Sequence, residues 1–237
     1  MNDKDQRVVL ITGAGGNLGR AVATAFAADG AALALLDRNA SAIEETIAAC
    51  RGQSSARAFA TDLIEPAAVE SAIAAVIDSF GRIDVLANIA GGFTMGPLVQ
   101  DTADRDWDFM MNLNARTVFN TCRQVIPHML AQGGGRIVNV SARAAAQGKG
   151  RMAPYCASKA AVITLTESLA AENRHTGINV NCILPGTIDT PQNRADMPDS
   201  NFDHWVPPAA LADVVFFLAS EGARCINGAA IPVYGQS

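Results

Sequence analysis

The stretch Arg7–Gly19, with the sequence RVVLITGAGGNLG, decides the fold. Its first part, Arg7–Thr12, is a short continuous apolar run, which is typical of a central parallel strand covered on both faces. A glycine-rich turn follows, and Arg20–Ala28 then has the composition of a helix. Glycines between a strand and a helix allow positive φ angles and let a pyrophosphate group approach the N–H groups at the helix start. The stretch therefore predicts a strand, a phosphate-binding turn and a helix.

A carboxylate marks the end of the next strand. We expect that strand at Ala31–Leu36, and Asp37 follows Gly19 by eighteen residues. A carboxylate at this distance can accept hydrogen bonds from an adenosine ribose and repels a 2′-phosphate, which favours NAD(H) over NADP(H). Arg38 favours the opposite preference, because a guanidinium there can hold the phosphate. We give Asp37 more weight because the glycine turn carries no cation. The alternative role for Asp37 is a helix cap or a turn residue.

The alternation of strand and helix continues along the chain. The next predicted elements are helix Glu44–Cys50, strand Ala56–Ala60, helix Ala67–Phe80 ended by Gly81, and strand Ile83–Ala87. Repeated units of this length without a linker indicate one α/β domain over residues 1–237. Its doubly wound parallel sheet should have about seven strands, with helices on both faces. Ligands of such sheets bind beyond the carboxyl ends of the strands. The residues expected along that edge are Gly13, Asp37, Asp62, Asn88, Ser141 and Pro185.

The second half of the chain contains one long connection. The elements expected around it are helix Trp107–Gln132, strand Gly135–Ser141, strand Ile178–Leu184, helix Ala209–Ala219 and a last strand at Gly228–Val233. Residues 186–207 are predicted to be a substrate loop or lid, because such long connections in a compact domain are usually functional. Met197, Phe202 and Trp205 give this loop an apolar face that could close over a ring-shaped or acyl substrate. The alternative is that they pack against the domain or a neighbouring subunit.

Tyr155 and Lys159 are the residues most suited to catalysis. Ala157–Ala171 is rich in Ala and Leu without Gly or Pro, so it predicts a helix, and Pro154 suits its first turn. Residues four apart share a helix face. A positive charge about 4 Å from a phenol, at an effective dielectric near 20, favours the phenolate by about 4 kcal/mol, or roughly 3 pKa units. The pair therefore predicts a general acid or base at neutral pH. The alternative is a chance pair on a surface helix.

Composition excludes several classes of partner. Hydrophobic residues make up 49% of the 237 residues and charged residues 17%, which suffices for a sizeable core. The formal charge is −5 and no basic cluster occurs, which argues against nucleic acid or an anionic membrane as a partner. No apolar run is long enough for a membrane-spanning helix, and residues 1–7 lack an apolar signal segment. We expect a soluble cytoplasmic protein.

The cysteines and histidines do not predict a metal site. The five cysteines are odd in number, widely spaced and without a C-x-x-C pair, so they indicate neither a disulfide framework nor a zinc site. The three histidines are equally scattered. We therefore expect no metal.

Four motifs together resemble the short-chain dehydrogenase/reductase family. They are Thr12-Gly13…Gly19, Asn88-Ile89-Ala90-Gly91, Tyr155…Lys159 and Pro185-Gly186, in the order and approximate spacing of that family. The resemblance covers essentially the whole chain. It implies a single Rossmann domain that binds NAD(H) or NADP(H), interconverts an alcohol and a carbonyl, and forms a homotetramer (or a homodimer) with the help of its last strand.

The resemblance also assigns site residues. The expected cofactor-binding positions are Gly13, Gly15, Asn17, Leu18, Gly19, Asp37, Arg38, Asp62, Leu63, Asn88, Ala90, Gly91, Tyr155, Lys159, Pro185, Gly186, Ile188 and Thr190. Asn17 replaces the family's middle glycine, and Asn is the residue that best tolerates a left-handed conformation after Gly. Thr190 would contact the nicotinamide carboxamide. Asn114 matches the family's helix-embedded asparagine, which holds a water in a proton relay with Lys159; Asn112 is the alternative candidate.

The family's serine is missing from its usual place. That serine stands thirteen residues before the tyrosine and binds the substrate oxygen, but here the position is Ala142, and Ser141 comes one place early. Neighbouring strand residues point to opposite faces, so Ser141 could point away unless a bulge restores it. The other possibility is that Tyr155 alone positions the carbonyl or imine.

Three other functions stay open at this stage. The segment from Leu184 to Trp205 resembles dihydropteridine reductases, family members that use NADH and also lack the serine, which suggests reduction of a quinonoid pterin or a related conjugated imine. Reduction of a 3-oxoacyl thioester is a second alternative to a simple ketone or alcohol substrate. A non-enzymatic dinucleotide-sensing regulator is the third, although a sensor has no need of Tyr155, Lys159 and Asn114.

Overall fold

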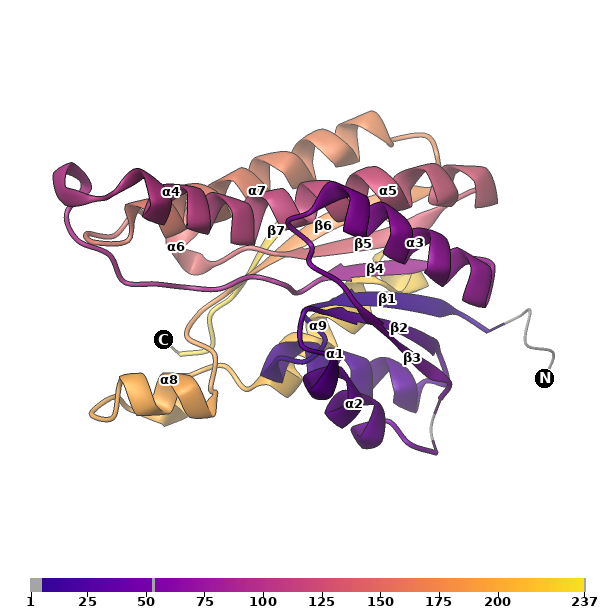
Figure 1. Ribbon diagram of the computed structural model, residues 1–237, viewed down its shortest axis with the longest axis horizontal. Helices are drawn as coiled ribbons and strands as arrows, with labels where there is room; N and C mark the ends of the chain where they lie inside the picture. Colours follow the sequence, from indigo (N-terminus) through magenta and orange to yellow (C-terminus); the bar gives the residue numbers. More distant parts are fainter. Residues whose placement is uncertain (1–5, 53, 237) are drawn as a thin grey trace.

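Seven parallel strands form one sheet in the order β3-β2-β1-β4-β5-β6-β7 (Figure 1). Their bounds are β1 Val8–Thr12, β2 Ala32–Asp37, β3 Ala56–Ala60, β4 Val85–Asn88, β5 Gly135–Val140, β6 Ile178–Pro185 and β7 Ala230–Val233. The computed structural model describes residues 6–52 and 54–236. Residues 1–5, in which no signal segment was expected, lie outside the described residues, as do residues 53 and 237.

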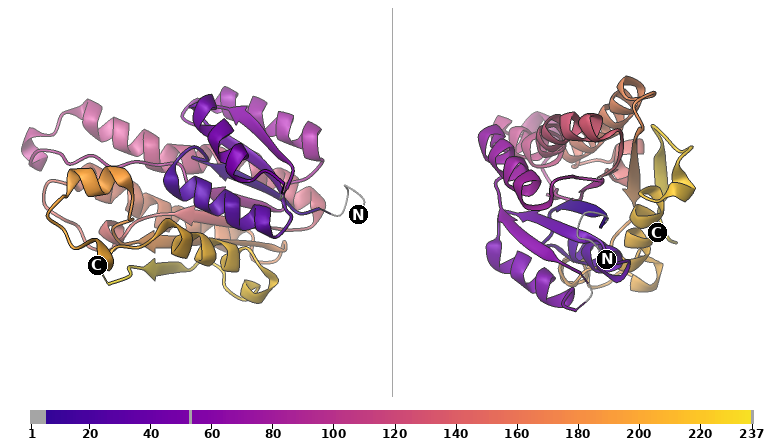
Figure 2. Two further views of the ribbon diagram at one scale, coloured as in Figure 1. Left: turned by 90° about the horizontal axis from the view of Figure 1, so that it is seen from below. Right: turned by 90° about the vertical axis from the view of Figure 1, so that its right-hand side faces the viewer.

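Helices cover both faces of the sheet. The helices are α1 Asn17–Ala28, α2 Ala40–Ala49, α3 Pro66–Phe80, α4 Asp104–Met111, α5 Thr117–Gln132, α6 Arg143–Ala146, α7 Ala153–Glu172, α8 Pro191–Asp196 and α9 Pro208–Leu218, with short turns η2 Val99–Asp101, η4 Phe202–His204 and η5 Glu221–Ala223. Helices α1, α2 and α9 lie on one side, and α3, α5 and α7 lie on the other (Figures 1 and 2). The predicted single-domain, doubly wound fold is therefore confirmed.

The apolar runs of the central strands fill two cores, because alternate side chains of a strand point to opposite faces. Val9 and Ile11 of β1 pack with α1 and α9 in one core, whereas Leu10 packs in the other core with α3, α5 and α7. All three side chains are fully buried. This burial explains why the strands are continuous apolar runs rather than alternating ones.

The strand order places a crevice at one edge of the sheet. From β1 the chain passes outward to β2 and β3, then returns to the other side of β1 and continues through β4 to β7. Ligands of open α/β sheets bind where the strand order reverses, beyond the carboxyl ends of the strands. In this molecule that point lies between β1 and β4.

Two helix predictions differ from the structure in detail. The region Trp107–Gln132 is helical throughout as predicted, but a π-helical turn, η3 Asn112–Arg116, interrupts its α-helical hydrogen bonding between α4 and α5. Helix α1 begins at Asn17 rather than at Arg20. Asn17 therefore has an ordinary right-handed helical conformation and does not use the left-handed conformation that we considered for it; the one described non-glycine residue with positive φ is Arg151.

Candidate active site

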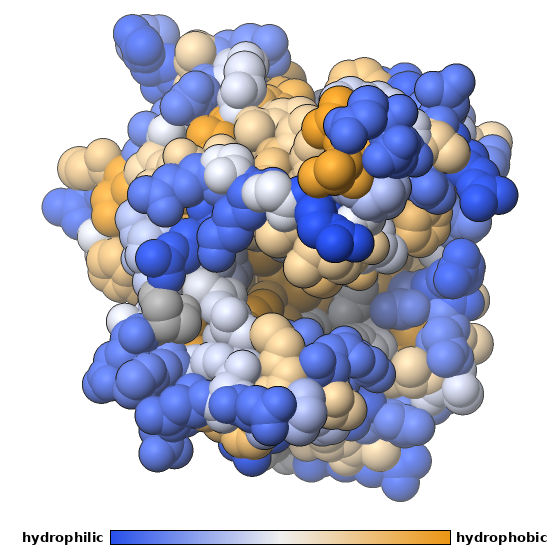
Figure 3. Space-filling model, turned by 90° about the vertical axis from the view of Figure 1, so that its left-hand side faces the viewer, coloured by the Kyte–Doolittle hydropathy of each residue, from blue (hydrophilic) through white to orange (hydrophobic). Residues whose placement is uncertain are grey.

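A cavity of about 770 Å³ opens at the carboxyl ends of the strands. This volume lies within the roughly 300–1,000 Å³ usual for ligand pockets. Figure 3 shows it as a hollow between two lobes of the molecule, with apolar residues in its depth. The predicted site residues that line it are Gly13, Asn17, Leu18, Gly19, Asp37, Arg38, Asp62, Leu63, Ala90, Gly91, Ser141, Tyr155, Lys159, Pro185, Gly186, Ile188 and Thr190.

The glycine turn is tightly folded against its neighbours. Gly13 has a φ of +64°, and a Cβ atom there would lie 2.8 Å from the backbone of Ala90. A Cβ on Gly19 would collide with the carbonyl of Gly13. Gly16 caps α1 without a side-chain hydrogen bond, so the first N–H groups of this helix face the cavity with no protein side chain capping them. Such a helix start suits an anionic group of a ligand.

Asp37 is fixed at the end of β2 beside this turn. Its Oδ2 accepts a hydrogen bond of 3.0 Å from the backbone N–H of Gly15, and its Oδ1 accepts one of 3.0 Å from that of Asn39. Gly15 itself does not line the cavity; its N–H orients the carboxylate instead. The alternative that Asp37 caps α2 is wrong, because Asn39 is the cap and accepts from the N–H groups of Ser41 and Ala42.

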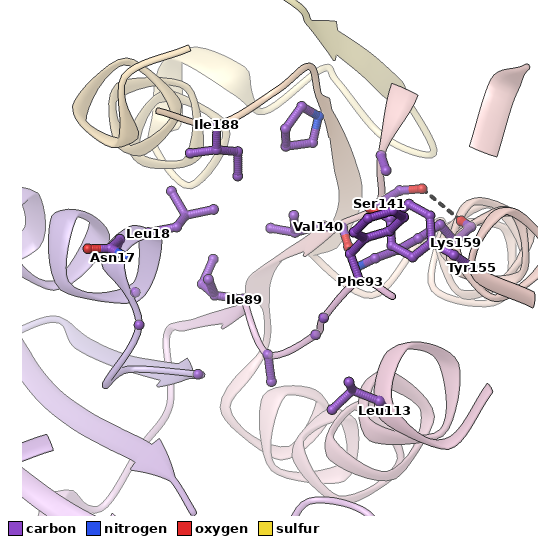
Figure 4. A pocket seen from close by; sticks show the side chains of 18 of the residues that line it. Asn17, Leu18, Ile89, Phe93, Leu113, Val140, Ser141, Tyr155, Lys159 and Ile188 are labelled. Atoms are coloured by element: carbon purple, nitrogen blue, oxygen red, sulfur yellow. Dashed lines mark hydrogen bonds between the residues drawn. The ribbon is translucent and has the colours of Figure 1, made fainter. Parts of the chain in front are cut away.

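Tyr155 and Lys159 lie one turn apart on α7, which starts at Ala153 with Pro154 in its first turn as predicted. Both side chains reach the cavity, and Figure 4 shows them together on its side opposite Asn17 and Leu18. The ring of Phe93 meets the Tyr155 ring edge-on, with centroids 5.0 Å apart. The helix therefore delivers the phenol and the amine to the same space as the glycine turn.

The effect of Lys159 on Tyr155 differs from our expectation. We expected the ammonium to lower the pKa of the phenol, but burial raises the pKa of Tyr155 to about 12. Burial also lowers the pKa of Lys159 to about 8, and its Nζ donates a 2.9 Å hydrogen bond to the carbonyl of Val140. In this arrangement desolvation is the largest effect on the pKa of the phenol, which keeps its proton at neutral pH.

Gly91 makes room for the amine. A Cβ atom on Gly91 would lie 2.9 Å from Lys159 Nζ and 2.7 Å from Asn114 Oδ1. The glycine is needed here for close approach and not for a left-handed conformation, because its φ lies outside the positive range. The turn after β4 thus brings Lys159 and Asn114 to one small volume.

Asn114 lies in the π-helical turn and is fully buried. Its Oδ1 accepts from the N–H of Gly92 at 2.9 Å, while its Nδ2 donates to the Gly92 carbonyl at 3.1 Å and to Ser158 Oγ at 3.0 Å. The side chain therefore ties the turn after β4 to α7. Short π-helical turns occur often at functional sites, and this one contains the asparagine that the family resemblance indicated.

Ala142 occupies the position of the family's serine, and Ser141 comes one residue before it. Ser141 is buried, and its hydroxyl donates a 2.7 Å hydrogen bond to the backbone carbonyl of Lys159, as Figure 4 shows. Its proton is therefore used within the protein. Ala142 also lines the cavity but offers no hydroxyl. No bulge brings a serine into the position that Ala142 occupies.

Asn88 does not line the cavity, contrary to our prediction. Its amide donates to Asn139 Oδ1 at 2.9 Å, and its Oδ1 accepts from the Thr121 hydroxyl at 2.7 Å. Asn139 in turn donates to the Thr166 hydroxyl at 2.9 Å. The side chain of Asn88 thus points into the protein between β5 and α5, where its role is to hold these elements together.

The loop that we predicted over 186–207 contributes less aromatic surface than expected. Met197 lines the cavity, but Phe202 and Trp205 do not reach it and instead contact each other, with ring centroids 4.8 Å apart and ring planes tilted by 58°. Trp205 is buried against the domain. Thr190 caps α8 by accepting a hydrogen bond from the N–H of Asn193.

Several lining residues were not found from the sequence. They include residues from loops and from the short helices η3, α6 and α8: Phe93, Met95, Leu113, Arg143, Lys149, Met152 and Asn193. A count of spacing from β4 and from Tyr155 could have indicated Phe93 and Met152. The others carry no local signal that separates them from ordinary loop residues.

The sequence of the chain agrees with one large family. A profile described as short chain dehydrogenase matches residues 7–201. The chain belongs to this family.

Relatives and solved structures agree over nearly the full length. The chain is 38% identical to 2-(R)-hydroxypropyl-CoM dehydrogenase of Xanthobacter autotrophicus, over 97% of each chain. It is 36% identical to D-threitol dehydrogenase of Mycolicibacterium smegmatis, over 98% of this chain and 92% of that one. The crystal structure of NAD⁺-bound xylitol dehydrogenase superposes with a TM-score of 0.89 at 31% identity, covering 97% of this chain and 98% of that one.

The cavity fits a nicotinamide dinucleotide. The glycine turn leaves the start of α1 open to a pyrophosphate, and Asp37 presents a carboxylate at the end of β2. A short-chain dehydrogenase of this kind is an oxidoreductase, and relatives of this chain are dehydrogenases. Among residues 6–52 and 54–236, no helix has the length and apolar character to cross a bilayer. Over the same residues no three His, Cys, Asp or Glu side chains gather into a possible metal site.

Proposed function

We propose that this short-chain dehydrogenase is an NAD(H)-preferring oxidoreductase that interconverts a carbonyl and an alcohol, with Tyr155 as general acid and base. The observation that carries the proposal is that Tyr155 and Lys159 share one cavity with the glycine turn and Asp37. A nicotinamide dinucleotide, when bound, supplies or accepts the hydride. The remaining contributions come from the side chains of this chain.

Tyr155 holds the proton that the substrate oxygen needs in the reductive direction. Because burial raises its pKa to about 12, the phenol is protonated at neutral pH and can donate to a developing alkoxide. The same shift leaves very little phenolate to act as a base at neutral pH, so the oxidative direction requires the charged form of Lys159 nearby. The pKa of Lys159, about 8, leaves most of that amine charged at neutral pH.

Lys159 and Asn114 support the phenol. The Lys159 ammonium would hold the ribose hydroxyls next to the nicotinamide and favour the phenolate electrostatically. Asn114 is the proposed relay residue; its side chain fixes Gly92 and Ser158 around the amine. We give Ser141 no role in binding the substrate oxygen, because its hydroxyl donates to the Lys159 carbonyl. Tyr155 alone then donates to that oxygen.

The preference for NAD(H) rests on Asp37. Two backbone N–H groups hold its carboxylate at the end of β2, where it would accept from ribose hydroxyls and repel a 2′-phosphate. Arg38 also lines the cavity and works against this preference. One relative in structure, xylitol dehydrogenase, was solved with NAD⁺, which supports the same choice. We further propose a cytoplasmic homotetramer, as the family resemblance implies, with residues 186–207 acting as the substrate loop.

The absence of a serine at position 142 favours a second candidate function. Dihydropteridine reductases, which the segment from Leu184 to Trp205 resembles, also lack this serine, and Ala142 lines the cavity where the family serine would stand. A dihydropteridine-reductase-like activity is therefore the second candidate. A 3-oxoacyl-thioester reductase uses the same residues and is separated from the first candidate by its substrate alone.

Two measurements in sequence test these proposals. The dissociation constants of NADH and NADPH are measured first, and we expect NADH to bind at least tenfold more tightly. Oxidation of the better coenzyme is then followed with a panel of ketones, 3-oxoacyl thioesters and quinonoid dihydropterin. Absence of pterin turnover discards the second candidate. Tight coenzyme binding without turnover of any carbonyl or imine would instead support a dinucleotide-sensing regulator.

A further inference from the structure

The Tyr155 side of the cavity is lined by an apolar collar, which we define as Phe93, Met95, Leu113, Met152 and Met197. These five side chains come from four separate segments of the chain. Three of them remain exposed although they are large and apolar: Phe93 by 49%, Met95 by 62% and Met197 by 39%. Exposed apolar side chains that gather around a hollow mark a ligand surface. Figure 4 shows Phe93 beside Tyr155, with Leu113 entering from the helix opposite.

Three polar side chains near the collar make hydrogen bonds within the protein. Ser141 donates to the Lys159 carbonyl, and Asn193 Nδ2 donates to the Ile188 carbonyl at 2.8 Å. Thr190 Oγ1 accepts from the N–H of Asn193. Ala142 replaces a hydroxyl with a methyl group. A substrate hydroxyl packed directly on the five collar side chains would lose its water without gaining a partner from them, which is unfavourable.

The collar is held in place on one side before any substrate arrives. The N–H of Gly96 donates to the Arg151 carbonyl at 2.9 Å, and Arg151 Nε donates to the Gly96 carbonyl at 3.3 Å. This pair, the Gly96–Arg151 clasp, joins the loop of Phe93 and Met95 to the loop before Met152. Arg151 adopts a φ of +63°, which is uncommon for a residue with a side chain. The clasp therefore fixes a conformation that the local sequence alone would not favour.

We propose that the substrate is a hydrophobic ketone, or the matching secondary alcohol, whose ring or bulky apolar group packs on the apolar collar, and that polyols are poor substrates. This inference rests on the proposed oxidoreductase function. Phe93 supplies a flat wall, and its edge-on contact with Tyr155 keeps that wall next to the reacting oxygen. The three methionines are flexible and can adapt to rings of different outline. The collar thus selects for apolar character more than for one exact shape.

The test compares two sets of neutral ketones. With NADH as coenzyme, kcat/KM is measured for cyclohexanone and acetophenone and for dihydroxyacetone and erythrulose. We expect the apolar pair to be preferred by about 100-fold or more. Phe93→Ala and Met197→Ala should each lower kcat/KM for the apolar ketones by about tenfold more than for the polyol ketones, mainly through KM. Phe217→Ala is the matched control, since Phe217 is 48% exposed and lies on α9 away from the cavity.

A binding measurement gives a readout besides turnover. Saturation-transfer NMR of the alcohol made from acetophenone should show binding to the protein without coenzyme, and Phe93→Ala should weaken it. Equal or better efficiency with the polyol ketones would overturn the collar inference and leave the oxidoreductase proposal intact. Unchanged kinetics in both collar variants would overturn it in the same way. If neither set of ketones is reduced, the oxidoreductase proposal fails, and the inference about its substrate fails with it.

Discussion

The two ends of the cavity are built in different ways. At the glycine-turn end, Gly13, Gly19 and Asp37 lie close together in the sequence, and the site consists of backbone N–H groups and close approaches. At the Tyr155 end, side chains arrive from four segments that tertiary contacts bring together. From this difference we infer that the dinucleotide, which family members share, is recognised by local backbone geometry. The substrate, which varies between family members, is recognised by side chains on loops.

The largest effect is expected at the Tyr155 end. Tyr155→Phe removes the proton donor but keeps the ring and its contact with Phe93. Turnover should fall by about 10²-fold or more, while the dissociation constant of NADH stays within a few-fold. Tyr234→Phe is the control, because the chain has 2 tyrosines and Tyr234 does not line the cavity. Full turnover in Tyr155→Phe would contradict the role of Tyr155 as proton donor and remove the distinction between the two ends of the cavity.

The second effect tests the close packing of Gly91 against Lys159 and Asn114. In Gly91→Ala, the new methyl group would lie within 3 Å of both Lys159 Nζ and Asn114 Oδ1, so the amine must move. We expect turnover to fall by about 10-fold to 100-fold, as misplacement of a catalytic group does, with the thermal unfolding midpoint lowered by only a few degrees. Gly148→Ala is the control, because nothing lies within 4 Å of its added methyl group. Equal activity of the two variants would show that close packing at Gly91 is unimportant.

The third effect belongs to the glycine-turn end alone. Asp37→Ala removes the carboxylate and should weaken NADH binding by about tenfold, which is the loss expected for hydrogen bonds to a charged group. NADPH binding should change less or improve, since the repulsion of its 2′-phosphate is removed. Isothermal titration with both coenzymes measures this, with Asp62→Ala as a comparison at the end of β3. An unchanged ratio of the two affinities would move the basis of the preference to Arg38.

The smallest effect concerns the pH dependence of stability. The folded protein has a Lys159 pKa of about 8, against an ordinary value of 10.5. Between those values the unfolded chain binds more protons than the folded one, so the contribution of Lys159 to the free energy of unfolding rises with pH. Relative to Lys159→Met, the free energy of unfolding of the wild type should increase by about 1 kcal/mol for each pH unit from roughly 8 up to the ordinary pKa of lysine. Urea unfolding of both proteins without coenzyme measures the difference; parallel curves would mean that the amine is not desolvated.

The fold and the glycine-turn end could be predicted because their signals are local. Apolar runs predicted all seven strands, and the glycines after Thr12 predicted the turn. Asp37 followed from its distance to Gly19. These features depend on neighbours in the sequence, which a linear pattern contains.

The Tyr155 end could be predicted only in part because it depends on distant contacts. The helix of Tyr155 and Lys159 was found, but the direction of the Tyr155 pKa shift was wrong, since a spacing does not tell how deeply a phenol is buried. The π-helical turn around Asn114 has no signature in hydrophobic periodicity. Asn88 was assigned to the cavity because it ends a strand, but its side chain faces the opposite way.

The inward turn of Asn88 has a consequence for how the molecule can change over time. A continuous chain of side-chain hydrogen bonds runs through the buried interior from α5 across β4 and β5 to α7. Its members are Thr121, Asn88, Asn139 and Thr166. An apolar substitution of any one member leaves its neighbours without a hydrogen-bond partner. Substitutions in this chain of hydrogen bonds are therefore tolerated only when adjacent members change together. These four buried residues therefore help to set the rotation of α7, and with it the orientation of Tyr155, together with the contacts of Asn114 and Ser141.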